Sequence, residues 1–329
     1  MSEIRLSLIM PSYNVEKYIE KNIQSVMKIK TQDCEFLYVN DGSTDATRSM
    51  IESYQKKDSR IRLIDKANAG LGAARNTGLD LCQGKYVYFI DSDDTINAEE
   101  IERSLIVAEK NKLDILKGRH RNVDQDDKVL FEPARDEREF TEQIWNGRDW
   151  LLGPRIYDIV CADMFRVEYL REQGFRFAEG VIHEDVDFVI SVLYPAERIM
   201  MSGLCVYNYY MRSGSIMHSY TPQHYLDTYK AAKRIEQFAE NNVSEDRVIA
   251  SAFTPYICDL YYAIPHLAIQ NGITLKSIMK NNDLRSDILN WTGKSKSLKI
   301  RIQYVSIKLK IYKCYSFFYK IYNCLRKKA

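Results

Sequence analysis

An apolar, aromatic run ends at an acidic turn in Tyr86-Val87-Tyr88-Phe89-Ile90-Asp91-Ser92-Asp93-Asp94. A second acidic turn follows an earlier apolar run and reads Val39-Asn40-Asp41-Gly42-Ser43-Thr44-Asp45. Each run has the length of a strand, so each turn places carboxylates at the carboxyl end of a strand. That edge is where open α/β sheets bind their ligands. Because hard cations prefer oxygen ligands, the two turns together predict a nucleotide at one and a divalent metal at the other.

Strand-like and helix-like segments alternate through the first 120 residues. We expect strands at 5–10, 35–40, 61–65, 86–90 and 114–118, and helices near 15–28, 45–57, 72–82 and 98–111. Strands separated by helices indicate a parallel sheet with right-handed crossovers. Further along, the pattern predicts an exposed hairpin or loop at 120–140, a helix at 142–152, a strand at 206–211 and helices over 222–291.

Two further segments carry candidate ligand-binding groups. A glycine-rich turn at Asn68–Gly72 leads into a helix that bears Arg75, whose planar guanidinium suits a diphosphate. The first strand ends at Pro11-Ser12-Tyr13-Asn14, where the aromatic ring is placed to stack on a base. Gly70-x-Gly72 is not a dinucleotide fingerprint, because Arg75 replaces the third glycine and the turn follows the third strand.

The order of four motifs resembles the family 2 glycosyltransferases over roughly Ile4 to Ser219. The motifs are Pro-Ser-Tyr-Asn, Asn-Asp-Gly-Ser-Thr-Asp, Ala-Arg-Asn-Thr-Gly and Asp-Ser-Asp-Asp. This resemblance implies an α/β fold of the GT-A type, a Rossmann-like, mostly parallel sheet flanked by helices, with a helical C-terminal extension. We expect a catalytic domain at 1–219, with a nucleotide-binding half at 1–120 and an acceptor half at 121–219. A helical extension at 220–293 and a basic tail at 294–329 would follow.

The resemblance also suggests which residues bind the donor. The candidate nucleotide-sugar residues are Pro11, Tyr13, Asp41, Arg75, Asp91 and Arg212. Asp41 would accept a hydrogen bond from N3–H of uracil, and Asp91 would lie on the ribose side. Asp93 is the expected ligand of Mn²⁺ or Mg²⁺, which neutralises the diphosphate as a Lewis acid, and His218 is a second candidate ligand.

Simpler interpretations of these residues stay open. Asp41 also suits an ordinary Asx-turn, Arg75 an exposed helix face, Asp94 a turn cap, and His218 a surface loop.

A Glu-Asp pair at Glu184-Asp185 offers a catalytic base. Inverting glycosyl transfer is a single displacement that needs a base for the acceptor hydroxyl. In the resembled family this base is the Asp of such a pair, about 90 residues after the Asp-x-Asp motif, which here is Asp185. The alternative is that both acids stabilise a helix N-terminus. One departure from the family pattern is Asp163, which stands where many members have a lysine before Met164-Phe165.

The charge of the chain is unevenly distributed. Eleven of the 47 basic residues lie in 294–329, which has no Asp or Glu, so the other 36 face 45 acidic residues. Apolar or aromatic residues recur there at steps of three and four, from Leu298 to Leu325, after a linker at Gly293–Ser297. A basic amphipathic helix of this kind predicts an interfacial anchor on anionic lipid, and packing on the body is the alternative. A nucleic-acid partner is not expected, because no RNA-binding motif accompanies the basic residues.

Other features bear on location and function. Seven cysteines without a Cys-x-x-Cys pair indicate reduced thiols in a cytosolic protein. We find no N-terminal signal sequence and no uncharged apolar run long enough for a transmembrane helix. We therefore expect a cytoplasmic enzyme, peripheral on the inner face of the plasma membrane. It would move a hexose or N-acetylhexosamine from a UDP-sugar to a lipid-linked surface glycan of a bacterium.

Two alternative functions remain. A sugar-nucleotide pyrophosphorylase would need a glycine-rich loop with Arg or Lys after the first strand, and Met10–Asn14 offers none. A non-catalytic membrane-binding scaffold would lack donor hydrolysis.

Overall fold

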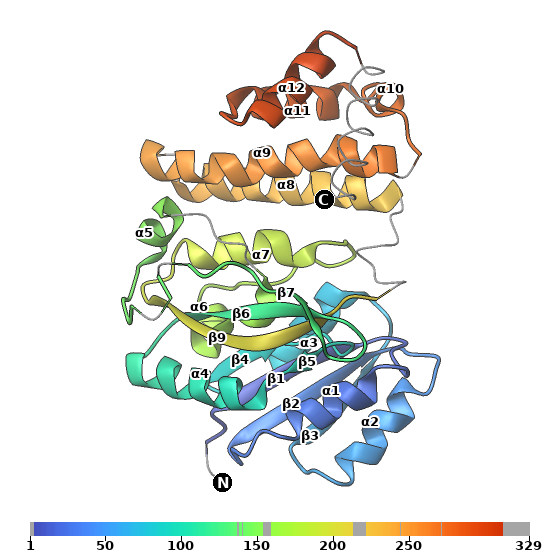
Figure 1. Ribbon diagram of the computed structural model, residues 1–329, viewed down its shortest axis with the longest axis vertical. Helices are drawn as coiled ribbons and strands as arrows, with labels where there is room; N and C mark the ends of the chain where they lie inside the picture. Colours follow the sequence, from blue (N-terminus) through green and yellow to red (C-terminus); the bar gives the residue numbers. More distant parts are fainter. Residues whose placement is uncertain are drawn as a thin grey trace. The chain divides into compact units, whose positions relative to one another are not determined.

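Four parallel strands form one half of the sheet in the computed structural model (Figure 1). They are β1 (Leu6–Ser12), β2 (Cys34–Asp41), β3 (Ile61–Lys66) and β4 (Tyr86–Phe89), in the order β3-β2-β1-β4. Every residue of β1 and β2 is buried, as expected for parallel strands covered on both faces. Their carboxyl ends bring the two acidic turns to one edge of the sheet.

The structure describes residues 3–136, 138–139, 141–153, 159–212, 222–243, 245–270 and 272–311. The chain divides into two compact units, Met1–Ser213 and Gly214–Ala329.

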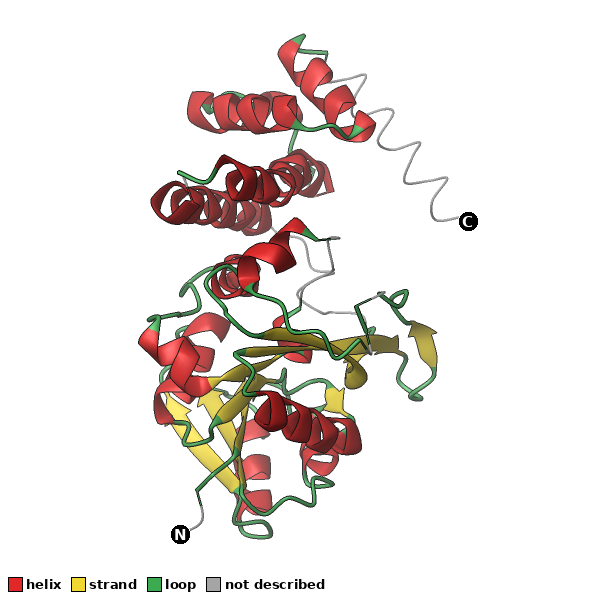
Figure 2. Cartoon of the chain, turned by 90° about the vertical axis from the view of Figure 1, so that its left-hand side faces the viewer, coloured by secondary structure: helices red, strands yellow, loops and turns green. Residues whose placement is uncertain are grey.

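Helices flank the sheet of the first unit (Figure 2). The crossover helices are α1 (Ile19–Val26), α2 (Thr47–Gln55), α3 (Leu71–Leu81) and α4 (Ala98–Asn111). They lie where the sequence predicts them. Gly78 lets α3 pack closely on β1, because a Cβ at this position would lie 2.3 Å from the Ile9 side chain.

The other half of the sheet is mixed. The short strand β8 (Met164–Arg166) is antiparallel to both β4 and β6 (Ile115–Val123), and it separates them. Beyond β6 lie β9 (Ile199–Tyr210) and β5 (Thr95–Ile96), and β7 (Val129–Phe131) pairs with β6 as the predicted hairpin. The sequence did not predict β8 or β5, because strands of three and two residues show no alternation.

The remaining elements of the first unit are short. They are α5 (Gly147–Leu152), a 3₁₀ turn η1 (Val160–Ala162), α6 (Val167–Glu172) and α7 (Glu184–Leu193). Of the helix predicted at 142–152, only the second half is helical, as α5. The strand β9 begins seven residues before the predicted strand at 206–211.

The second unit is helical. It consists of α8 (Pro222–Val243), α9 (Arg247–Gln270), α10 (Leu275–Ile278), α11 (Asn282–Lys294) and α12 (Leu298–Lys308). The helices α8, α10, α11 and α12 all contact α9. Among the described residues, none of the helices is both long and apolar enough to span a bilayer.

The basic tail differs from its prediction in two ways. Gly293 and Lys294 belong to α11, so the linker is limited to residues 295–297. The helix α12 ends at Lys308, and Lys310 has a left-handed φ of +60°, so one continuous helix does not run from 298 to 325. Residues 312–329 lie outside the described part of the chain.

Candidate active site

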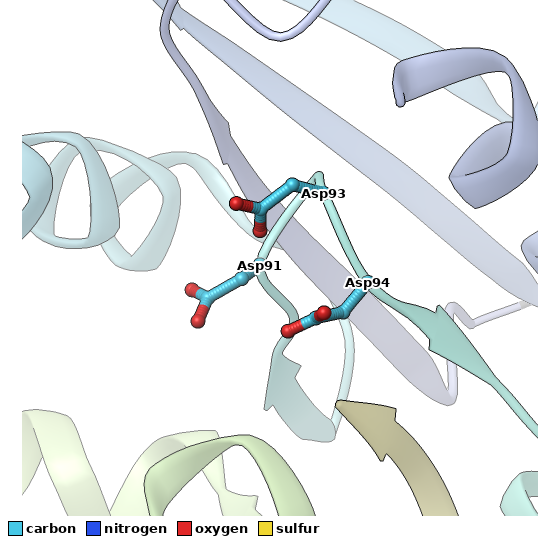
Figure 3. Close-up of side chains that lie close together, drawn as sticks. All are labelled: Asp91, Asp93 and Asp94. Carbon is cyan, nitrogen blue, oxygen red and sulfur yellow. The ribbon is translucent and has the colours of Figure 1, made fainter. Parts of the chain in front are cut away.

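Three carboxylates gather on the turn between β4 and β5. Asp91, Asp93 and Asp94 have ligand atoms within 4.8 Å of one another (Figure 3). The side-chain amide of Asn22 on α1 holds the turn by donating to the carbonyls of Asp91 (3.2 Å) and Asp94 (2.8 Å). The Ser92 hydroxyl donates to the carbonyl of Pro11 at 2.7 Å. These hydrogen bonds fix the turn to α1 and to the end of β1.

Asp94 is the buried member of the cluster. Its side chain is 1% exposed and accepts hydrogen bonds from the Tyr207 hydroxyl and from the Tyr210 amide, the latter at 2.8 Å. Burial raises the pKa of Asp94 to about 8, and the nearby Asp91 charge adds to this shift. With both oxygens bonded, Asp94 anchors the turn to β9, which agrees with its interpretation as a structural residue.

Asp93 is paired with a basic side chain that follows β9. Its carboxylate forms an ion pair with Arg212, which follows β9 and also donates to the Asp93 carbonyl at 3.2 Å. The guanidinium lies 4.2 Å from the centre of the Tyr18 ring. Burial lowers the pKa of Arg212, although Tyr18 and Asp91 oppose this shift. The donor set offered by Asp91 and Asp93 is entirely oxygen, which suits Mg²⁺ or Mn²⁺.

Arg75 joins the acidic turn to α7. The side chain is 2% exposed and lies on α3, where one arm of its fork donates to Asp91 (2.7 Å) and the other to Glu184 (2.5 Å). Burial alone would lower the pKa of Arg75, but the two carboxylates raise it above its usual value. The sequence predicted contact with a diphosphate. In the structure, both arms bond to carboxylates.

The Glu-Asp pair opens α7, as its motif suggests. His183 precedes it with a left-handed φ of +66°, a conformation that costs non-glycine residues free energy and is common at functional sites. Glu184 is buried, which raises its pKa above the usual range, while Arg75 favours the ionised form. Asp185 is partly exposed, and within the described chain its carboxylate has no hydrogen-bond or ion-pair partner. Of the two acids, only Asp185 is therefore available to a substrate.

Aromatic packing fixes α7 against the sheet. Phe188 on α7 stacks on Phe177 with ring centroids 3.9 Å apart, and Phe177 meets Phe89 of β4 edge-on at 4.8 Å. At the start of α3, a Cβ on Gly72 would lie 2.2 Å from the carbonyl oxygen of Ala178. Because Gly72 has no side chain, the segment before α7 can lie directly against α3. This packing places Glu184 within reach of Arg75.

The first acidic turn lies at the neighbouring strand end. Both oxygens of Asp41 are bonded: Oδ1 accepts from Lys66 (2.6 Å) and the Ala69 amide (3.0 Å), and Oδ2 from the Gly70 amide (2.8 Å). Asp41 therefore shapes the glycine-rich turn before α3. Tyr13 is 50% exposed just after β1, so about half of its surface is accessible to a ligand.

A sequence model of glycosyl transferase family 2 matches residues 7–173, more than half of the chain. The chain belongs to glycosyltransferase family 2. The resemblance found in the sequence is thereby confirmed.

Known family members support this assignment. The uncharacterized glycosyltransferase EpsJ of Bacillus subtilis is 34% identical over 215 residues, which are 61% of this chain and 60% of EpsJ. Glycosyltransferase GlyA of Streptococcus pneumoniae is 28% identical over 66% of this chain and 32% of GlyA. The matched region thus spans at most about 60% of the length of these two relatives.

The fold also matches a solved structure. A crystal structure of S. aureus TarS 1–349 in complex with UDP-GlcNAc aligns with a TM-score of 0.71 and 22% identity, covering 94% of this chain and 91% of that TarS 1–349 chain. This likeness confirms the predicted GT-A fold with a helical C-terminal region.

The structure brings most of the predicted family 2 site residues to one sheet edge, and His218 lies outside the described residues. Asp163 is buried and accepts from Lys117 of β6 at 2.5 Å, so its charge is neutralised locally. Sequence analysis missed Asn22, Lys66 and Tyr207, which hold the two turns. Each is a common residue on an ordinary helix or strand, so no local signal marks it.

Proposed function

We propose that this family 2 chain transfers a hexose or N-acetylhexosamine from a UDP-sugar to an acceptor hydroxyl, with inversion at the anomeric carbon. The observation that carries the proposal is the Arg75 fork, which ties Asp91 of the acidic turn to Glu184. The adjacent Asp185 has no carboxylate partner among the described residues. The acidic turn and an available carboxylate are thus held close together, which supports a site that binds a donor and removes a proton. The choice of uridine is supported by the UDP-GlcNAc bound to TarS.

The base and ribose would bind at the first two strand ends. A carboxylate has about four lone-pair sites, and Asp41 uses three of them, so one remains for the N3–H of uracil. The half-exposed Tyr13 ring would stack on the same base beside Pro11, and Asp91 would face the ribose. Cytosine lacks an N3–H, so Asp41 would select uracil.

The diphosphate would bind at the second turn. Asp93, assisted by the Asp91 carboxylate, would hold Mn²⁺ or Mg²⁺. The bound ion supplies Lewis-acid neutralisation of the leaving diphosphate. Arg212 would turn from Asp93 to the phosphate oxygens once they arrive, because its fork fits phosphate as well as carboxylate. In the proposed roles Arg75 contacts no phosphate and instead keeps Asp91 and Glu184 in place.

Asp185 would act as the base. It would accept the proton of the acceptor hydroxyl as that oxygen attacks the anomeric carbon from the face opposite the diphosphate. A single displacement of this kind inverts the anomeric configuration. Glu184 cannot take this role while it is buried and bonded to Arg75.

The acceptor and location extend the proposal. We propose a lipid-linked surface glycan as acceptor and a peripheral position on the inner face of the plasma membrane. The basic composition of 294–329 supports this location. In this scheme residues 1–219 catalyse transfer, 220–293 extend the body and 294–329 approach the membrane.

A donor-hydrolysis screen tests the proposal without knowledge of the acceptor. The purified chain is incubated with UDP-glucose, UDP-galactose and their N-acetyl forms, with Mn²⁺ or with chelator, and UDP release is measured. We expect slow, metal-dependent UDP release from one donor. A Glu99→Gln variant, changed at an exposed position of α4, serves as the control and should match the wild type. No UDP from any donor would contradict the proposal, and UTP formed only with added pyrophosphate would identify a pyrophosphorylase.

A further inference from the structure

One face of α12 is apolar and exposed. Its side chains recur at steps of four, three and four residues, which places them on one side of the helix. This surface, the α12 ridge, comprises Leu298 (74% exposed), Ile302 (51%), Val305 (45%) and Leu309 (62%). Single exposed apolar residues are ordinary, but a contiguous row of four marks an interaction surface.

The opposite face of α12 is already packed. Ile300 and Ile307 are buried, and the Gln303 amide donates to the Tyr262 carbonyl of α9 at 3.0 Å. The helix contacts both α9 and α11. Rotating α12 to bury the ridge would expose two isoleucines and break this hydrogen bond, so the ridge is held outward by the body of the second unit.

Basic residues alternate with the ridge residues along the sequence. Exposed basic side chains lie on α12 and on the segments beside it, and they are Lys294, Lys296, Lys299, Arg301, Lys308 and Lys310. The sequence has no acidic residue from 294 to 329. We propose that the α12 ridge docks on an anionic lipid bilayer, with its apolar side chains in the headgroup region and its basic residues against lipid phosphates.

The charge of the surface favours an anionic bilayer over a second copy of the chain and over residues 312–329. A second copy of the chain would bring the same basic surface opposite itself, and like charges would repel across the contact. Residues 312–329 add five basic residues and no acidic one, so they provide no counter-charge. An anionic bilayer supplies both an apolar layer and the missing negative charge. The inference rests on the membrane location proposed above, for which it names the docking surface. It does not depend on the proposed donor or acceptor, because lipid binding is measured without either.

The ridge is tested with the full-length protein and sedimented vesicles of phosphatidylcholine, with or without phosphatidylglycerol. The ridge variant carries Leu298→Gln, Ile302→Gln and Val305→Gln, which keep helix propensity and charge. The control variant carries Ile106→Gln and Val248→Gln, which change residues of similar exposure on α4 and α9. We expect the ridge variant to bind phosphatidylglycerol vesicles at least tenfold more weakly than wild type, and the control to bind normally. Equal melting temperatures would show that both variants fold.

A charge variant tests the electrostatic part independently. Lys296→Gln, Arg301→Gln and Lys308→Gln together should weaken binding on the order of 100-fold. The matched control changes three exposed lysines elsewhere, Lys110, Lys276 and Lys280, to glutamine. Wild-type binding should also weaken at high salt, where charges are screened.

Three results would overturn the proposal. The first is a wild type that does not bind phosphatidylglycerol vesicles. The second is a ridge variant that binds as strongly as its control, which would assign binding to another surface. The third is a wild type that dimerises in sedimentation velocity, with a monomeric ridge variant and no vesicle binding. That result would make the ridge a contact between copies.

Discussion

The guanidinium of Arg212 is paired with the carboxylate of Asp93 and lies 4.2 Å from the centre of the Tyr18 ring. Arg212 therefore places its positive charge on the carboxylate that we assign to the metal. The metal ion and the Arg212 guanidinium would need the same Asp93 oxygens, so the two should compete for them. The competition should end when a diphosphate offers Arg212 another partner. In the proposed function, this relationship would make Arg212 a counter-charge for Asp93 before the metal and donor bind, and a phosphate ligand afterwards.

The first prediction concerns this competition. Arg212→Gln should bind Mn²⁺ more tightly than wild type without nucleotide, by about fivefold if the ion pair contributes about 1 kcal/mol. The same variant should bind UDP more weakly, because a phosphate contact is lost. Mn²⁺ titration followed by electron paramagnetic resonance and calorimetry with UDP measure the two effects. The control is Arg103→Gln on the exposed face of α4. Unchanged affinities in both titrations would show that Arg212 has neither role.

Asp93→Asn should abolish metal-dependent donor hydrolysis. The amide is neutral, so it binds a divalent ion weakly and leaves the diphosphate charge uncompensated. Asp93 is partly exposed, so the fold should tolerate the change. UDP release is measured with Mn²⁺ and with chelator. Hydrolysis equal to wild type, and still sensitive to chelator, would place the metal elsewhere.

Asp185→Asn should stop transfer while leaving nucleotide binding nearly intact. A base acts on the acceptor and not on the diphosphate, and its loss should reduce the rate on the order of 10²–10⁴-fold. Calorimetry with UDP and a transfer assay on the same preparation separate the two properties. Loss of UDP binding would make Asp185 a donor-site or structural residue instead.

Arg75 should be more important for folding than a surface arginine. Arg75→Met leaves Glu184 buried beside no positive charge, and breaking such a pair costs about 3 kcal/mol or more of unfolding free energy. Adding Glu184→Gln should recover part of this loss, because the amide carries no charge to desolvate. Denaturant unfolding of the two single variants and the double variant measures the coupling. Strict additivity of the two changes would contradict the proposed link between α3 and α7.

The local parts of this site were predictable from sequence, and its long-range parts were not. The acidic turn at Asp91–Asp94 stands out because composition changes abruptly from apolar to acidic. The Glu184-Asp185 pair stands out through its resemblance to the family motif and its distance from that turn. The pairing of Arg75 with Glu184 could not be predicted in this way, because the two residues are 109 positions apart. Only the packed position of α7 brings them together.

The tail shows a second limit of sequence analysis. The apolar spacing of α12 was visible, yet the packed face is formed by Ile300, Gln303 and Ile307 and not by the more regular row from Leu298. A pattern shows that a helix has an apolar face, but the surface of the neighbouring helices decides which face it buries.

Asp94 should make stability depend on pH. Its folded pKa, about 8, lies above its usual value of 3.8, so folding favours the protonated acid. The stabilising contribution of the neutral acid is therefore complete below about pH 4 and is lost as the pH rises through about 8.

Asp94→Asn is neutral at every pH and can still bond the Tyr207 hydroxyl and the Tyr210 amide. The variant should gain stability relative to wild type as the pH is raised from 5 to 9, by up to about 1.4 kcal/mol per unit. Thermal unfolding in chelator, with the exposed Asp126→Asn as control, measures this difference. A difference between Asp94→Asn and wild type that stays constant over this range would show that Asp94 is ionised in the folded chain.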